Sequence, residues 1–192
     1  MLVPTPPRQK PGSPGQPGAG LALPVVRLRI VLAEVVPEVW RRLQLPSNFT
    51  LRRLHVVLQH AMGWKVAPQH LFRVGSSLFG MPSEGSGALK DSRWVTLQDL
   101  LARKETAFNY EYGPGTRWIH QVRIEGLHDG NSTDQRPACL AGAGACPPED
   151  CGGPGAYAEI LEAGRRNGKL VDLHPDAFDL DAINTALASL RF

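Results

Sequence analysis

Three cysteines lie close together in the stretch Cys139-x6-Cys146-Pro-Pro-Glu-Asp-Cys151-Gly-Gly. A tetrahedral zinc ion takes four thiolate or imidazole ligands, and loops rich in Pro and Gly can bring such ligands together. We therefore expect either one structural zinc ion or no cofactor. The candidate ligands are Cys139, Cys146, Cys151 and His120. His70, His128 or the carboxylate of Asp150 could supply the fourth ligand instead, and the alternative to zinc is a tight loop whose cysteines pack as small apolar side chains.

A second chemistry follows from the arginines of the N-terminal part. Residues 1–73 carry ten Lys or Arg against two acids, whereas residues 74–192 carry eleven against sixteen. Guanidinium groups on one surface would contact phosphates and give salt-dependent binding of nucleic acid. The candidate contact residues are Arg27, Arg29, Arg41, Arg42, Arg52 and Arg53. The alternatives are an acidic protein partner, or arginines that only solvate the surface or pair with the acidic C-terminal part.

A predicted hairpin carries four of these arginines. Residues 25–33 alternate apolar and polar side chains, which is typical of a half-buried strand, and residues 39–45 predict a second strand beside it. Because successive side chains of a strand point to opposite faces, Arg41 and Arg42 should lie on opposite faces of the sheet. The alternation therefore weakens the case for a single patch.

A predicted helix carries the other two arginines in its first turn. Thr50 is the expected N-cap, apolar residues recur at three- and four-residue spacing to Met62, and Gly63 stands where a helix commonly ends. Alternation and capping residues predict further strands and helices within residues 70–80, 96–103, 108–112, 118–125 and 179–190.

The cysteines are expected to share one long loop over residues 126–153. Pro154 at a first helical position predicts a helix to about Arg166. Glu149 and Asp150 are expected to satisfy the free N–H groups at the start of that helix.

These elements predict an α+β fold, in which antiparallel hairpins form a mixed sheet packed against a few helices. Residues 1–24 are rich in Pro and Gly and predict a disordered tail, followed by one domain over residues 25–192. Apolar runs fall short of the roughly 18 residues of a membrane span, and the N-terminus lacks the pattern of a secretory signal. With its odd cysteine count, the chain is expected in the cytoplasm and away from membranes.

Several segments together resemble one family: Val39-Trp40-Arg41-Arg42-Leu43, Ala61-Met62-Gly63-Trp64, His70-Leu71-Phe72, Tyr110-Glu111-Tyr112 and Ala145-Cys146-Pro147-Pro148-Glu149-Asp150-Cys151-Gly152-Gly153. They make the chain similar, over about residues 25–190, to the Ri-plasmid Orf-three-like domain family. The resemblance implies an α+β domain. Some relatives are labelled transposon passenger or resolvase-like proteins, which implies a link to mobile elements.

The chain departs from the family pattern at polar positions. Relatives have His-x-His where this chain has Pro68-Gln69-His70, and Tyr-Asp-Phe-Gly-Asp-x-Trp where it has Tyr112-Gly113-Pro114-Gly115-Thr116-Arg117-Trp118. A carboxylate replaced by glycine cannot hold a divalent cation. These differences imply a divergent member that keeps the fold and the cysteine loop but has lost any activity that used those positions.

The sequence therefore favours a non-enzymatic binding or adaptor module, associated with mobile elements and contacting nucleic acid or an acidic partner through its arginines. The alternative is an enzyme, with or without a metal ion, whose pocket is formed by Cys151, Glu149, Asp150 and His120.

Overall fold

The computed structural model describes residues 22–65, 67–113, 117–130, 135–169 and 174–192. Of the tail predicted over residues 1–24, residues 1–21 lie outside the described ranges. The strands and helices of the described residues are, in chain order, β1 (Val25–Leu32), β2 (Trp40–Pro46), α1 (Leu51–Met62), β3 (His70–Val74), β4 (Ser77–Gly80), β5 (Leu89–Asp91), α2 (Leu97–Ala102), β6 (Ala107–Tyr112), β7 (Trp118–His128), β8 (Ala138–Ala143), α3 (Pro154–Arg166) and α5 (Leu180–Ala188). None of these helices is long and apolar enough to cross a bilayer.

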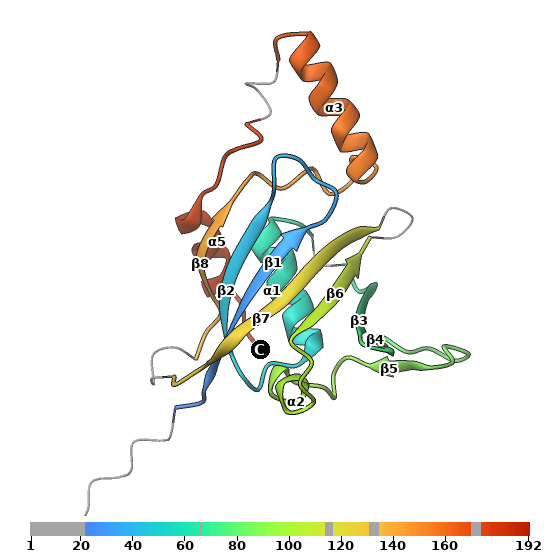
Figure 1. Ribbon diagram of the computed structural model, residues 1–192, viewed down its shortest axis with the longest axis vertical. Helices are drawn as coiled ribbons and strands as arrows, with labels where there is room; N and C mark the ends of the chain where they lie inside the picture. Colours follow the sequence, from blue (N-terminus) through green and yellow to red (C-terminus); the bar gives the residue numbers. More distant parts are fainter. Residues whose placement is uncertain (1–21, 66, 114–116, 131–134, 170–173) are drawn as a thin grey trace, which may run out of the picture.

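One curved sheet contains all the strands, in the order β5-β4-β3-β6-β7-β1-β2-β8 (Figure 1). Neighbouring strands run antiparallel except β4 and β5, which are parallel. The predicted α+β class with a mixed sheet is confirmed. In β1 the buried and half-exposed side chains alternate, as its sequence predicts.

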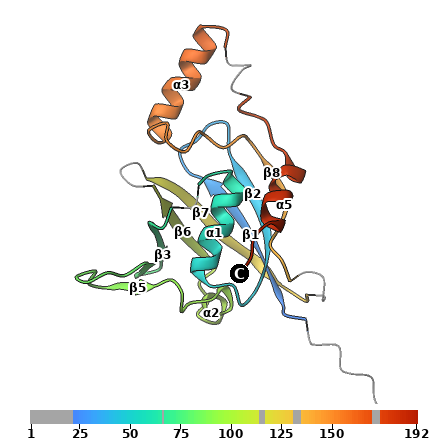
Figure 2. The ribbon, with the colours of Figure 1, turned by 180° about the vertical axis from the view of Figure 1, so that it is seen from behind.

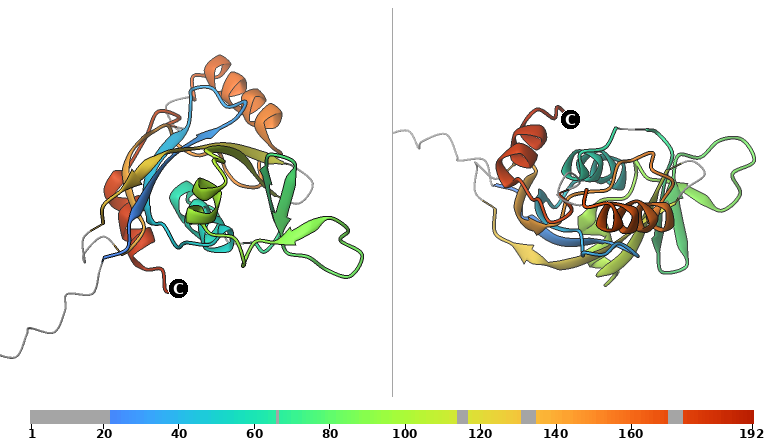
Figure 3. Two further views of the ribbon diagram at one scale, coloured as in Figure 1. Left: turned by 60° about the horizontal axis from the view of Figure 1, so that its bottom comes forward. Right: turned by 90° about the horizontal axis from the view of Figure 1, so that it is seen from above.

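Helix α1 fills the hollow of the sheet (Figures 2 and 3). The Thr50 side chain accepts the Arg53 N–H at 3.2 Å, and Gly63 ends the helix at φ 73°, a conformation that glycine adopts without strain. Both predicted helix ends are confirmed. The fully buried apolar side chains of the helix and the sheet include Leu51, Leu54, Leu58, Leu28, Ile30, Leu43, Phe72 and Trp118.

The other helices close the edges of this core. The capping box of Thr96 and Asp99 is present at the start of α2, as predicted. Helix α5 packs on β8 and α1, and the Asn184 amide exchanges two hydrogen bonds with the backbone of Cys139, at 2.8 and 3.0 Å. Helix α3 projects away from the sheet in Figure 1 and is anchored by the buried side chains of Tyr157 and Leu161.

The predicted long loop over residues 126–153 is wrong in its middle, because β8 pairs with β2 there and contains Cys139. The strand sequence Ala-Cys-Leu-Ala-Gly-Ala has small side chains of low strand propensity, so only the exposed edge of β2 selects the extended form. The sequence does not predict strand β5 either. Its three residues form a strand only because they pair with β4.

Arg41 is buried beneath the sheet, which corrects its place among the predicted nucleic-acid contacts. Its side chain lies on the α1 side, opposite to that of Arg42, and is only 3% exposed. The guanidinium donates to the carbonyls of Ala61, Trp40, Ala143 and Gly144 at 2.8–3.2 Å. Arg41 thus ties α1 and β2 to the chain that leaves β8.

We expect Arg41→Ala to lower the free energy of unfolding by about 3 kcal/mol, because it leaves several buried carbonyls without a donor. The neighbouring Arg42→Ala is the matched control and should have little effect, since Arg42 makes a solvent-exposed ion pair. Urea denaturation of the two variants measures the difference. Equal stabilities would show that the Arg41 hydrogen bonds do not hold the two segments together.

Candidate functional site

Residues 146–153, here called the signature loop, are clamped by two tryptophans. The indole N–H of Trp64, just after α1, donates to the Pro147 carbonyl at 2.8 Å. The indole N–H of Trp118, at the start of β7, donates to the Glu149 carbonyl at 3.1 Å. The loop is therefore fixed to both layers of the fold.

The Glu149 carboxylate adds a third attachment. It accepts the Lys65 backbone N–H at 2.9 Å and the Tyr112 hydroxyl. Burial, together with this carboxylate, raises the pKa of Tyr112 to about 12, so the hydroxyl keeps its proton. The prediction that Glu149 caps the helix over residues 154–166 is wrong, because α3 begins at Pro154, after the N-cap residue Gly153, and has no side-chain cap hydrogen bond.

A cavity of about 670 Å³ lies between the signature loop and the end of α1, and we call it the signature pocket. Its size is typical of small-molecule sites. The polar side chains that line it are Lys65, Tyr112, Cys146, Glu149 and Asp150, and apolar residues such as Met62 and Pro147 form the rest of its wall.

The three cysteines lie in three different surroundings. Cys139 is buried in β8, the Cys146 sulfur contacts Arg41 and the Met62 sulfur at 3.3 Å each, and the Cys151 sulfur lies 4.0 Å from the Gly153 carbonyl. Burial raises the pKa of all three thiols, that of Cys146 to about 11. They are therefore protonated at neutral pH and poorly suited to act as nucleophiles.

The predicted zinc ligands are not gathered into one group. Across the described ranges, no three His, Cys, Asp or Glu side chains are arranged so that they could hold a metal ion. His120 lies fully buried in β7, against the rings of Trp64 and Tyr110. The zinc ion stays a prediction, and this arrangement gives it no support.

A buried polar cluster lies behind the signature pocket, around the Tyr110 hydroxyl. The Gln59 amide donates to this hydroxyl at 2.7 Å, and Nδ1 of His55 lies 2.7 Å from it. Because the hydroxyl accepts from Gln59, its own hydrogen is free to go to His55. Helix α1 and strand β6 thus share one hydrogen-bonded centre.

Three histidines of this cluster are held neutral. The rings of His55 and His70 stack with their centroids 4.2 Å apart, and Nδ1 of His70 donates to the Pro68 carbonyl at 2.8 Å. Burial lowers the pKa of His55 to about 3 and that of His120 to about 4, and it lowers the pKa of His70 as well. Neither ring nitrogen of His120 has a hydrogen-bond partner among the described residues.

The outer face of the sheet carries three of the six predicted arginines. Arg29 stands directly opposite Arg42 of β2 and Arg123 of β7 in the strand register, and Arg27 lies nearby on β1. We call these four residues the arginine face. Arg29 pairs with Glu38 at 2.8 Å, and Arg42 pairs with Glu125 at 2.7 Å, which lowers the pKa of that carboxyl.

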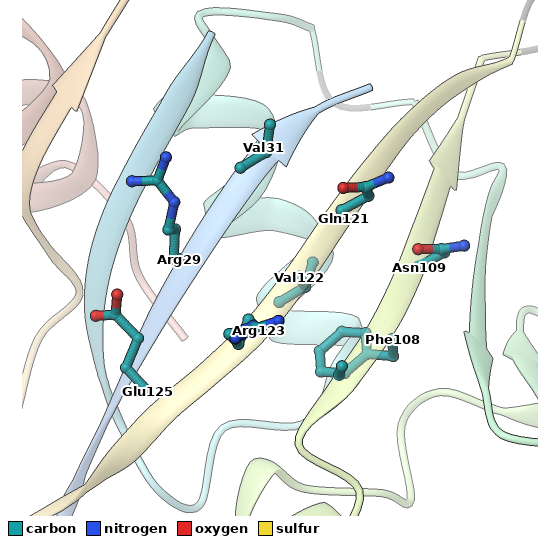
Figure 4. Close-up of a pocket in the computed structure, with 9 residues that line it drawn as sticks. Arg29, Val31, Phe108, Asn109, Gln121, Val122, Arg123 and Glu125 are labelled. Atoms are coloured by element: carbon teal, nitrogen blue, oxygen red, sulfur yellow. The ribbon is translucent and has the colours of Figure 1, made fainter. Parts of the chain in front are cut away.

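A cavity of about 520 Å³ opens on this face, over β1, β6 and β7. Figure 4 shows Arg29, Arg123, Asn109 and Gln121 around it. In the described residues Arg123 has no ion-pair partner. The remaining predicted arginines, Arg52 and Arg53, lie on α1 behind the sheet, where Arg52 contacts the Met81 sulfur and Arg53 lies over the Phe49 ring.

Comparison with known proteins identifies the family. The sequence profile of the plasmid pRiA4b ORF-3-like proteins matches residues 24–186. The chain belongs to the plasmid pRiA4b ORF-3-like family. It is 42% identical over 144 residues to the uncharacterized protein y4hQ of Sinorhizobium fredii (strain NBRC 101917 / NGR234), covering 72% of each chain. It is also similar to the crystal structure of the protein of unknown function MM3350 from Methanosarcina mazei Go1, with a TM-score of 0.75 and 27% identity over 83% of this chain and 96% of that one.

One of the positions at which the chain departs from the pattern implied by the family resemblance, Gly113, lines the signature pocket. Residues 114–116 lie outside the described ranges. Arg117, which follows them, pairs with Glu111 at 3.2 Å, and Arg73 contacts the same carboxylate. The Glu111 carboxylate therefore forms ion pairs with both Arg73 and Arg117.

The sequence did not predict the contacts that three residues of these sites make, although two of them, Trp64 and Tyr110, belong to segments that resemble the family. Trp64 stands just after the predicted helix end, Tyr110 lies inside a predicted strand, and Arg123 belongs to the alternating stretch over residues 118–125. That alternation is a usable signal for Arg123, because it places Gln121 and Glu125 on the same face. The roles of Trp64 and Tyr110 depend on partners far along the chain.

We expect Glu149→Gln to lower the free energy of unfolding by about 1–2 kcal/mol, because an amide has one acceptor oxygen for the two donors Lys65 and Tyr112. The adjacent Asp150→Asn changes an exposed carboxylate and is the matched control, with little change expected. Thermal and urea denaturation compare the two. A Glu149→Gln protein as stable as the control would contradict the clamp.

We expect the free energy of unfolding to fall as the pH drops below 6.5, because His55 and His120 are buried. In the unfolded chain these two histidines take up a proton near the ordinary pKa of 6.5, whereas in the folded chain the pKa is about 4 for His120 and about 3 for His55. The stabilisation is therefore complete above pH 6.5 and is lost on acidification, at about 1 kcal/mol per pH unit for each histidine.

The variant His120→Leu removes one of these groups and should make the free energy of unfolding less dependent on pH between pH 6 and about 4.5. The control is His60→Gln on α1, since His60 is half-exposed. Urea denaturation at several pH values gives the slopes. An unchanged slope in His120→Leu would show that His120 does not resist protonation.

Proposed function

We propose that this protein is a non-enzymatic, cytoplasmic binding module that holds single-stranded nucleic acid on the arginine face of its sheet, in association with a mobile element. The observation that carries the proposal is the row of Arg123, Arg29 and Arg42 on three neighbouring strands. Like charges directly opposite one another destabilise a sheet. Glu38 and Glu125 offset two of these charges, and an anion bound at Arg123 would offset the third.

The other side chains of this face favour a nucleic acid over an acidic protein. Trp40 is partly exposed, and the guanidinium of Arg29 lies 4.3 Å from its ring centroid. Asn109 and Gln121 are exposed amides that can pair with the edges of unstacked bases. Aromatic rings for stacking, together with cations for the backbone, are typical of single-strand binders.

The shape of the face favours a single strand over a duplex. The arginines span three strands, and neighbouring strands lie about 4.8 Å apart before side chains are added. A DNA major groove is about 12 Å wide and admits a helix or a two-stranded ribbon. A single strand can instead lie across the sheet.

We expect a labelled single-stranded oligonucleotide to bind at low salt, as measured by fluorescence anisotropy, with an affinity that falls as salt rises. Arg123→Gln should weaken binding several-fold and reduce the slope of log affinity against log salt by about one, since it removes one phosphate contact. The charge-matched control is Arg166→Gln on α3, which should leave both unchanged.

Two outcomes would contradict the proposal. Absence of binding at low salt excludes it, and equal weakening by the two substitutions would mean that net charge alone attracts the oligonucleotide. Polyglutamate competing as well as unlabelled oligonucleotide would favour the acidic protein partner instead.

A further inference from the structure

A second group of arginines lines a cavity of about 300 Å³ at the end of the sheet where β1 begins and β2 ends. Arg53 comes from α1, Arg136 precedes β8, and Arg191 follows α5. Segments far apart in the sequence thus bring three guanidinium groups to one hollow. The C-terminal residues Leu190, Arg191 and Phe192 form part of the wall of this cavity.

None of these three arginines forms an ion pair in the described part of the chain. No carboxylate oxygen of those residues lies within the 4.0 Å of an ion pair from any of the three guanidinium groups. The cavity wall also contains no Asp or Glu side chain. Three like charges around one hollow repel each other, and a bound anion removes that repulsion.

Rings and carbonyls hold two of the guanidinium groups in place. Arg53 lies over the rings of Phe49 and Phe192, at 5.6 and 5.7 Å from their centroids. Arg191 donates to the carbonyls of Ala188 and Leu190 at 3.0 Å each, through a single nitrogen. Their other N–H groups donate to no atom of the described residues, so the positions are fixed while these groups can still donate to an anion.

We propose that this cavity binds a phosphate monoester. A guanidinium group matches two phosphate oxygens at once, and a monoester carries about −1.5 to −2 charges at neutral pH, which three arginines can balance. The cavity is larger than a bare phosphate needs, and apolar residues such as Pro46, Leu187 and Leu190 form part of its wall. An organic body joined to the phosphate fits there, as in a mononucleotide.

This site is independent of the proposed nucleic-acid surface. The arginine face shares no lining residue with the cavity. The phosphate monoester has two possible sources, a free mononucleotide or the 5′ end of a nucleic acid strand. The two sources share the group that the arginines recognise.

The test is calorimetric titration of the full chain with AMP, inorganic phosphate and adenosine at constant ionic strength. We expect AMP to bind more tightly than phosphate, and adenosine not to bind. Arg136→Gln changes an exposed side chain and should weaken AMP binding about tenfold. Arg166→Gln and Arg123→Gln are controls that should leave the AMP affinity unchanged.

Adenosine binding as tightly as AMP would overturn the proposal, and so would an AMP affinity that Arg136→Gln leaves unchanged. A second titration in the Arg123→Gln background compares 5′-phosphorylated and 5′-hydroxyl oligonucleotides with AMP. Tighter binding of the 5′-phosphorylated strand than of AMP assigns the cavity to strand ends, and tighter binding of AMP assigns it to free mononucleotides. If the oligonucleotide does not bind to the arginine face but AMP still binds, the nucleic-acid proposal fails and the proposal for this cavity stands. If AMP does not bind, the proposal for this cavity fails whatever the oligonucleotide does.

Discussion

The hydroxyl of Tyr110 is the polar link on which the packing of α1 against the sheet depends. His55 and Gln59 lie on the buried side of α1, and a polar group buried without a partner costs about 1–3 kcal/mol. One hydroxyl on β6 meets an atom of each side chain, at 2.7 Å in both cases. Both contacts form only when α1 has a particular rotation about its axis and a particular position along the sheet. Tyr110 therefore fixes the position of α1 on the sheet, and with it the position of Trp64 over the signature loop.

This packing separates the two faces of the sheet by chemistry. The inner face is filled by α1 and by the aromatic side chains of β3, β6 and β7. The outer side chains of β1, β2 and β7 need only be polar, yet they place Arg29, Arg42 and Arg123 in one row. Nothing in the folding of the inner face requires that row. The proposed binding of nucleic acid would account for the row, whereas the stability of the fold does not.

The sequence predicts those elements whose signals are local. The Thr50 side chain accepts the Arg53 N–H at the start of α1, the Gly63 backbone N–H donates to carbonyls of its last turn, and Thr96 caps α2 through a residue three positions away. The arrangement of Arg41 and Glu149 could not be predicted, because their partners lie up to about a hundred positions away along the chain. The alternation of the strand places Arg41 on the inner face, but only the carbonyls around it show why a charge is stable there.

The carboxylates beside the signature pocket are used mainly for structure, which bears on whether this member does chemistry there. Glu149 accepts from Lys65 and Tyr112, and Glu111 is held between Arg73 and Arg117. A carboxylate that acted as a general base at either position would first have to give up donors that hold the loop or the sheet. Asp150 is exposed, and the thiols nearby keep their protons because burial raises their pKa. The contacts of Glu149 and Glu111 thus hold the signature loop and the neighbouring strands in place.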